Sequence, residues 1–141
     1  MSETNPQHAA IDMLARRDHS EKEMRTKLKR KGIDAETIDS VVEWLYGKKL
    51  LDDRVFAEKR AASLFRTKLV GPRWIDAKLR EAGISGDIIH DVLESLASSE
   101  EWGERAKEAI VAWKRLHPKH AEDTVRHMRF LASRGFTVNG Y

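Results

Sequence analysis

Asp18, His19 and Ser20 are adjacent, and their side chains are the three types that make up the catalytic triad of serine hydrolases. A triad requires these side chains to hydrogen-bond in series, which neighbours on a single turn cannot do. Glu23 follows Ser20 by three positions, which is the spacing of a capping box at the start of a helix. The segment therefore predicts a helix start rather than a nucleophilic site.

His117, His120 and His127 form a second group whose residue type could bind a metal ion. No carboxylate at a suitable spacing completes such a site, so we interpret them as exposed loop and helix side chains. The chain has no cysteine, which excludes a disulfide scaffold, a thiolate zinc site and a cysteine nucleophile. It also lacks a phosphate-binding loop and a dinucleotide-binding glycine motif. We expect no enzymatic activity, no cofactor, no metal and no small-molecule ligand.

The charged residues are more informative. Lys and Arg number 26 against 23 Asp and Glu, so the net charge is only +3. The segments 22–31 and 54–73 are nevertheless strongly basic, with six Lys or Arg and one Glu in each. Solvated helix faces are the simpler interpretation of either segment alone. The functional interpretation is a basic ridge along one side of the body, which would attract phosphates or an acidic protein. Trp74, Trp102 and Trp113 have the helical spacing of core residues, which we favour over base stacking.

The elements that position these residues follow an internal repeat of about fifty residues. Gly32, Gly83 and Gly135 are separated by 51 and 52 positions, and a leucine stands four residues before each of them. Apolar residues follow the first two glycines in matching register and at helical spacing. The chain therefore contains degenerate copies of one helical unit.

Each unit is predicted to hold three helices, with Gly32 ending the second helix of the first unit and Gly47 ending the third. Asp52 or Asp53 begins the next helix, and Ser85 or Gly86 begins the last helix of the second unit. We expect residues 1–8 to be a flexible tail, 9–50 and 51–99 to be three-helix repeats, and 100–141 to be a truncated third repeat. No segment is long and apolar enough to span a membrane.

The predicted fold class is therefore all-α, with tandem three-helix repeats that form an elongated, curved body. A unit of about fifty residues buries little core by itself, so neighbouring units must stack. Leu50, Leu51 and the region of Trp102 are the expected apolar contacts between units. Only six residues follow Gly135, so the third helix of the third unit is expected to be missing or vestigial.

Three segments resemble the RecX family of regulatory proteins. The sequence LARRDHSEKEMRTKL at 14–28 is similar to that family's L-x-x-R-x-H-S-x-x-E-L…K-L signature, and LLDDRVFA at 50–57 is similar to its L-x-D-D-x-x-F-A joint. Gly71-Pro72 and the segment LREAGI at 79–84 match its second unit. The motif residues that we assign to caps, joints and core are Asp18, His19, Ser20, Glu23, Gly32, Asp52, Asp53, Phe56, Gly71 and Gly83.

The composition makes a reduced, cytoplasmic setting the expectation, and we expect a monomer. The resemblance implies a bacterial protein that binds in the groove of the filament formed by RecA on single-stranded DNA. It implies that filament growth, ATP hydrolysis and strand exchange are thereby limited. The partners would be RecA and single-stranded DNA, contacted directly or through RecA. The candidate contact residues are Arg16, Arg17, Lys22, Arg25, Lys27, Lys29, Arg30, Lys31, Arg54, Lys59, Arg60, Arg66, Lys68 and Arg73.

Two alternatives remain open on the sequence alone. A three-helix unit with a short turn is compatible with a helix-turn-helix transcription factor that binds duplex DNA. Its candidate recognition helices, however, share no base-reading pattern of Asn, Gln or Arg. The other alternative is a helical adaptor with an unrelated protein partner.

The RecX family usually continues into a further helix at its C-terminus, where this sequence departs from the family's pattern.

Overall fold

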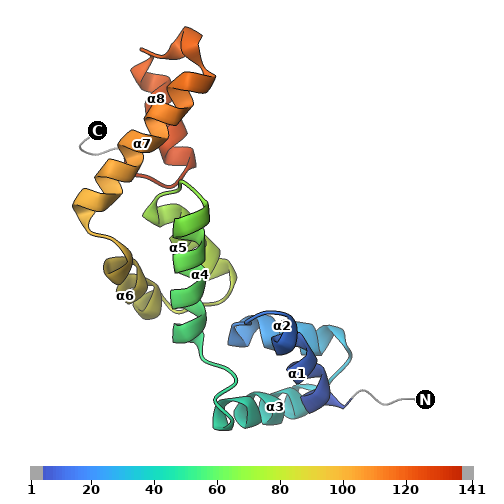
Figure 1. Ribbon diagram of the computed structural model, residues 1–141. Helices are drawn as coiled ribbons and strands as arrows, with labels where there is room; N and C mark the ends of the chain where they lie inside the picture. The colour runs from blue at the N-terminus through green and yellow to red at the C-terminus, as the bar shows by residue number, and fades with distance from the viewer. Residues whose placement is uncertain (1–4, 138–141) are drawn as a thin grey trace.

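The computed structural model describes residues 5–137. This part of the chain is entirely helical apart from its connecting loops, which confirms the predicted all-α class (Figure 1). The elements are α1 (Pro6–Arg16), α2 (Glu21–Arg30), α3 (Ala35–Gly47), α4 (Asp53–Thr67), α5 (Pro72–Glu81), α6 (Gly86–Leu96), α7 (Ser99–Leu116), the 3-10 helix η1 (Pro118–His120) and α8 (Thr124–Ser133).

The helix starts follow local capping chemistry. Asn5 accepts hydrogen bonds from the backbone N–H groups of Gln7 and His8, so α1 begins at Pro6. The expectation of a flexible tail over residues 1–8 is therefore wrong for Pro6, Gln7 and His8, and its remainder at 1–4 lies outside the described residues. Of the two candidates for the start of α4, Asp52 is the capping residue.

The repeated glycines end equivalent helices. Gly32, Gly83 and Gly135 all have positive φ, at 84°, 84° and 82°. In each case the residue after the glycine donates its N–H to the carbonyl of the leucine four positions before the glycine, as in Ile33 to Leu28. This hydrogen bond explains why the leucine and the glycine repeat together.

Gly47 is the last residue of α3, as predicted, but it is not the residue that turns the chain. It lies within α3, and Lys49, with φ 58°, is the residue that adopts the left-handed conformation after that helix. Lys49 donates its N–H to Tyr46 and Leu50 donates to Leu45, which turns the chain without a glycine. The helix therefore ends at Gly47, and the left-handed conformation that glycine adopts after α2, α5 and α8 is adopted here by Lys49.

Three separate apolar cores stabilise the fold. The cores lie within α1–α3, within α4–α6, and between α7 and α8. Leu51 belongs to the first core and Leu50 is 42% exposed, so neither joins two units as expected. Trp102 of α7 does contact the second core, where its ring meets that of Phe65 edge-on at 5.4 Å.

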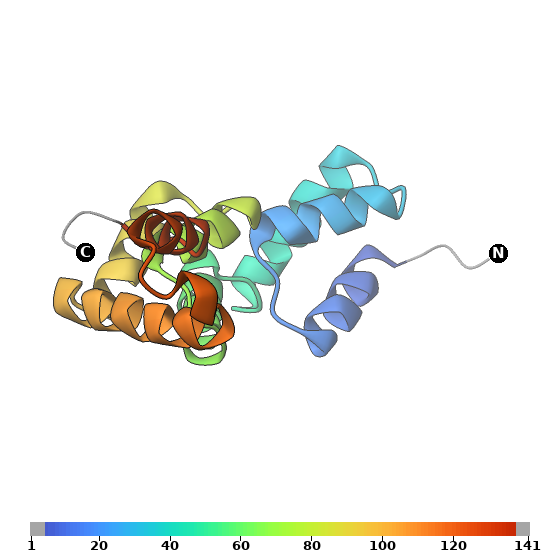
Figure 2. The same ribbon diagram turned by 90° about the horizontal axis from the view of Figure 1, so that it is seen from above.

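The three units follow one another in a row and give an elongated body (Figures 1 and 2). The unit formed by α1–α3 lies at one end, and α7 with α8 lies at the other. The segment expected to hold or lack a third helix in the third unit falls mainly on 138–141, outside the described residues. No helix in the described part combines the length and apolar character that a membrane span requires.

Candidate partner-binding surface

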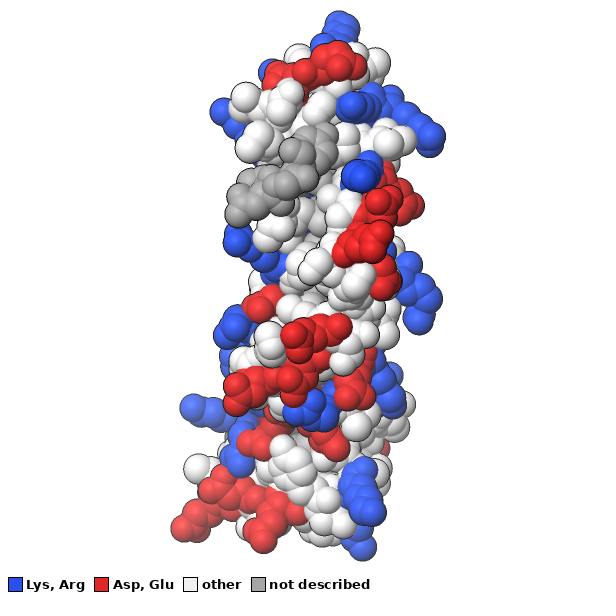
Figure 3. All heavy atoms as spheres, turned by 90° about the vertical axis from the view of Figure 1, so that its left-hand side faces the viewer, with Lys and Arg blue, Asp and Glu red and all other residues white. Residues whose placement is uncertain are grey.

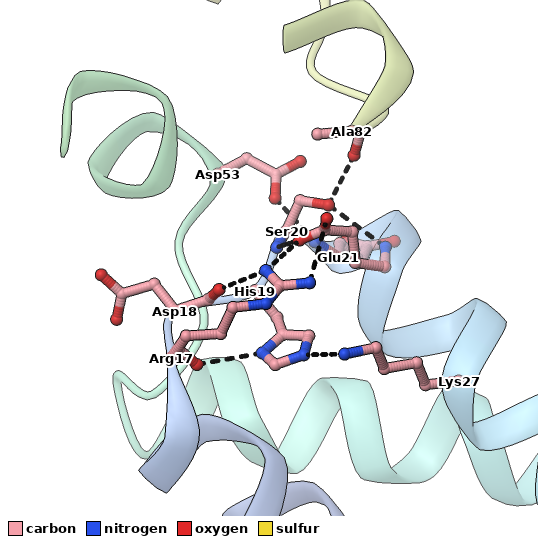
Figure 4. A network of polar contacts seen from close by, with 9 residues as sticks. Arg17, Asp18, His19, Ser20, Glu21, Lys27, Asp53 and Ala82 are labelled. Atoms are coloured by element: carbon pink, nitrogen blue, oxygen red, sulfur yellow. Dashed lines mark hydrogen bonds and ion pairs between the residues drawn. The ribbon is translucent and has the colours of Figure 1, made fainter. Parts of the chain in front are cut away.

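Ser20 lies in the loop between α1 and α2 and is fully buried (Figure 4). Its hydroxyl accepts the Glu23 N–H at 3.1 Å, and the Glu23 carboxylate accepts the Ser20 N–H at 3.2 Å. The predicted capping box is therefore confirmed. The same hydroxyl donates to the carbonyl of Ala82 at the end of α5. Ser20 thus starts a helix in the first unit and links that unit to the second.

Arg17 is held by the same capping box. Its guanidinium donates to both carboxylate oxygens of Glu23, at 3.0 and 3.4 Å, and to the carbonyl of Asp18 at 2.8 Å. Burial alone would raise the pKa of Glu23, but hydrogen bonds from Arg17 and from the Ser20 N–H keep it below its usual value. The guanidinium of Arg17 is therefore occupied by hydrogen bonds within the protein and is less available to a partner.

His19 is buried and has a defined tautomer. Its Nδ1 lies 3.0 Å from the carbonyl of Arg17, which can only accept, so Nδ1 carries the proton. Its Nε2 lies 2.7 Å from the ammonium of Lys27 and is therefore the acceptor. Burial lowers the pKa of His19 below 6.5 and so favours this neutral ring. His19 thereby holds Lys27 in place.

Acidification is expected to destabilise the protein through His19. Because the pKa of His19 is lower in the folded state than in the unfolded state, its contribution is complete above about pH 6.5 and is lost as the pH falls through the folded-state pKa. Urea unfolding of the wild type and of His19→Gln at about pH 7.5 and pH 5.5 measures this effect. The wild type should lose more stability between these pH values than the variant. Equal losses would contradict the assignment.

Arg25 and Glu21 belong to a second network at the start of α2. The Glu21 carboxylate accepts from the Tyr46 hydroxyl at 2.6 Å and from Arg25 Nε at 2.9 Å. The hydrogen bond from Tyr46 is the main reason that the pKa of Glu21 is lowered. Arg25 also donates to Asp39 at 2.7 Å. With two carboxylate partners, Arg25 is not a free cation.

Polar contacts form the boundary between the first and second units. Besides Ser20, the Glu21 N–H donates to Asp53 at 2.8 Å, where burial raises the pKa of the carboxyl group. The aliphatic stem of Lys22 covers Gly83 so closely that a Cβ on this glycine would lie 2.4 Å from Lys22 Cβ. Asp18 and Lys59 form an ion pair at 3.5 Å. Several of the predicted motif and contact residues therefore position the two units.

The boundary between the second and third units is tighter. The Gly71 N–H donates to the Arg134 carbonyl at 2.8 Å, and the Arg73 N–H donates to Gly135 at 3.0 Å. A Cβ on Gly71 would lie 2.4 Å from the Gly135 oxygen, and a Cβ on Gly135 would lie 2.2 Å from the Trp74 nitrogen. Glycine is required at both positions because the two backbones touch.

Arg105 completes this boundary and was not among the predicted residues. Its guanidinium donates to the carbonyls of Lys68, Phe65 and Val70, at 2.8, 3.1 and 3.4 Å. The guanidinium also lies 3.8 Å from the centre of the Phe65 ring. Burial lowers the pKa of Arg105. No sequence signal distinguishes it from other arginines, because the carbonyls that it satisfies lie about forty residues earlier in the chain.

The predicted contact residues that remain available gather mainly at the first unit. A groove of about 810 Å³ lies between α1 and α2, and Arg16, Arg30 and Lys31 are exposed along it without an ion pair to any described residue. A second groove of about 710 Å³, between the first and second units, includes Arg60. Lys29 and Arg66 are exposed on the outer faces of their helices.

Of the other predicted cations in the second unit, Arg54 and Lys68 have partners, whereas Arg73 has no ion pair to a described residue. Arg54 pairs with Asp91 at 3.3 Å, and the ammonium of Lys68 lies 5.3 Å from the centre of the Trp74 ring. The side chain of Arg73 is exposed. Figure 3 shows acidic groups over much of the middle of one face and basic groups mostly at its two edges. That face therefore does not carry the continuous basic ridge that the sequence suggested.

The structure does not assemble the candidate metal ligands. No group of three or more His, Cys, Asp or Glu residues suited to a metal occurs among residues 5–137. His117 stacks on Trp113 with the ring centres 4.5 Å apart, and His127 meets the same ring edge-on at 5.3 Å. His127 is buried, so the expectation that all three histidines are exposed is wrong. Trp113 is half-buried and contacts these two rings and that of Phe130, but it is not part of the three apolar cores, so the expectation that it is a core residue is not confirmed.

Comparison with known proteins agrees with this architecture. Residues 8–45 match the RecX first three-helix domain, and residues 52–93 match the RecX second three-helix domain. A crystal structure of a regulatory protein RecX superposes on the chain with a TM-score of 0.84 at 25% sequence identity, covering 94% of this chain and 69% of that one.

Curated relatives share the same segments. A regulatory protein RecX from Halorhodospira halophila is 35% identical over 136 residues, which is 93% of this chain and 80% of the relative. One from Listeria monocytogenes is 35% identical over 106 residues, which is 75% of this chain and only 39% of the relative. The domain matches and the extent of the Halorhodospira alignment show that the chain belongs to the RecX family of regulatory proteins, which are not enzymes.

Proposed function

We propose that this chain regulates RecA by binding along the filament that RecA forms on single-stranded DNA. In this proposal it limits filament growth, ATP hydrolysis and strand exchange. The observation that carries the proposal is an elongated row of RecX three-helix units with unpaired cations on the first two units. A filament groove offers an acidic protein surface close to a DNA backbone, to which such a body is complementary.

The ion pairs of the structure narrow the set of contact residues. Arg17, Lys22, Arg25, Arg54 and Lys59 are engaged with other groups of the chain, so we assign them to positioning. The exposed cations without an ion pair to a described residue are the proposed contacts. These are Arg16, Lys29, Arg30, Lys31, Arg60, Arg66 and Arg73.

The test is RecA-dependent ATP hydrolysis on single-stranded DNA. The wild-type chain should inhibit hydrolysis at micromolar concentration, and the double variant Arg60→Glu, Arg66→Glu should require about tenfold more protein. Lys119→Glu, Arg129→Glu is the matched control, because it makes the same change of net charge at exposed positions of the third unit. This control should inhibit like the wild type.

Two results would overturn the proposal, and a third would overturn the assignment of its contacts to the second unit. Wild-type protein that leaves hydrolysis unchanged would exclude RecA regulation. Sequence-selective gel shifts of duplex DNA without RecA would instead support a helix-turn-helix transcription factor. Equal inhibition by the wild type and the Arg60→Glu, Arg66→Glu variant would exclude the second unit as a contact surface.

A further inference from the structure

The groove between α1 and α2 combines cations with an apolar floor. Its lining residues are Asn5, His8, Ala9, Asp12, Met13, Arg16, Arg17, His19, Lys27, Arg30 and Lys31. Asp12 is the one acidic residue among them, and it lies 3.7 Å from the ring of His8. The groove therefore attracts anionic groups.

The cations of this groove differ in whether another group of the protein already binds them. Arg17 is engaged by Glu23, and the Lys27 ammonium is held by His19 at 2.7 Å (Figure 4). Because the neutral ring of His19 accepts from Lys27, the lysine keeps its full charge while its position is fixed. Arg16, Arg30 and Lys31 form no ion pair with any described residue, so their charges remain to be neutralised by a ligand.

The floor favours a peptide over a nucleic acid. Ala9 and Met13 belong to the first apolar core and are only 7% and 8% exposed, so they give the floor a small aliphatic surface, and methionine adapts to varied side chains. The lining contains no Trp, Tyr or Phe, whereas surfaces that bind single-stranded nucleic acid normally stack bases on such rings.

We propose that this groove binds an acidic peptide segment of a partner protein, with carboxylates paired to Arg16, Arg30 and Lys31 and an aliphatic side chain on Met13. The site goes beyond RecA regulation, because it recognises the chemistry of the segment whichever protein carries it. Charge complementarity and the apolar floor are the basis for this choice of occupant.

The experiment measures fluorescence anisotropy of a labelled Asp-Glu-Leu-Asp-Glu-Leu-Asp-Glu peptide with the full chain and without RecA. The double variant Arg16→Glu, Arg30→Glu should weaken binding by about tenfold or more, and Lys119→Glu, Arg129→Glu should leave it within about twofold. Replacing both leucines of the peptide by serine should also weaken binding, because the aliphatic contact is lost. Circular dichroism checks that each variant is folded.

Two further outcomes separate the alternatives. Oligothymidylate that displaces the peptide and binds more tightly than it would assign the groove to nucleic acid and overturn the proposal. Equal loss of binding in both double variants would show non-specific attraction and also overturn it. The assay contains no RecA, so its failure leaves the ATP hydrolysis test untouched, and peptide binding without RecA inhibition would refute only the proposed function.

Discussion

Gly135→Ala is expected to lower the free energy of unfolding by about 3 kcal/mol or more. Gly135 has φ 82°, and a Cβ there would lie 2.2 Å from the Trp74 nitrogen and 2.6 Å from Trp74 Cβ. The left-handed conformation alone accounts for about 1 kcal/mol. The remainder comes from separating the backbones of the second and third units, since a main-chain nitrogen cannot rotate away.

Chemical denaturation of the purified chain measures this change. Gly32→Ala is the matched control, because Gly32 has φ 84° but a Cβ there would have no neighbour within 4 Å. The control should lose only about 1 kcal/mol. If Gly135→Ala and Gly32→Ala lowered the free energy of unfolding equally, the contact between the second and third units would not be the reason that position 135 requires glycine.

Arg105→Ala is expected to lower the free energy of unfolding by about 3 kcal/mol. The substitution leaves the carbonyls of Phe65, Lys68 and Val70 without the guanidinium that now lies within 3.4 Å of all three. It also removes the cation from the Phe65 ring, where it is 3.8 Å from the ring centre. Trp102 packs edge-on against the same ring, so tryptophan fluorescence should report the loss.

Two further variants, Arg105→Lys and Lys107→Ala, serve as comparisons for the stability of Arg105→Ala. Arg105→Lys keeps the charge but has a shorter side chain and lacks the planar guanidinium that lies against the Phe65 ring, so its stability should fall between those of the wild type and Arg105→Ala. Lys107→Ala, at an exposed position of the same helix, should change stability by less than about 0.5 kcal/mol. If Arg105→Ala matched Lys107→Ala, the bonds to the three carbonyls would contribute little.

The parts of the fold that depend on local chemistry could be predicted from the sequence. The Ser20 capping box and the positive φ of Gly32 and Gly83 each involve residues within one helical turn of each other. The repeat of about fifty residues then placed equivalent helices in two units, because a leucine and a glycine at fixed spacing close the same hydrogen bond.

The parts that depend on distant pairs could not be predicted. The bond from Ser20 to Ala82 joins residues 62 positions apart, and Arg105 reaches carbonyls 35 to 40 positions away. Charge counts along the chain also could not show that Arg25 is paired with Asp39, which lies on another helix. For the candidate surface, the sequence therefore identified the candidate Lys and Arg residues. Only the fold shows which of them form ion pairs with other described residues and which do not.

Among residues 5–137, the first three helices share no apolar core with the helices that follow, and the polar bonds around Ser20 link them to the second unit. A boundary made of a few polar contacts contributes less to stability than an extended apolar core, so we expect this end of the molecule to open as its own cooperative unit in hydrogen exchange. The second boundary, where the backbones of two units touch, should keep α4–α8 together while the first three helices change their orientation.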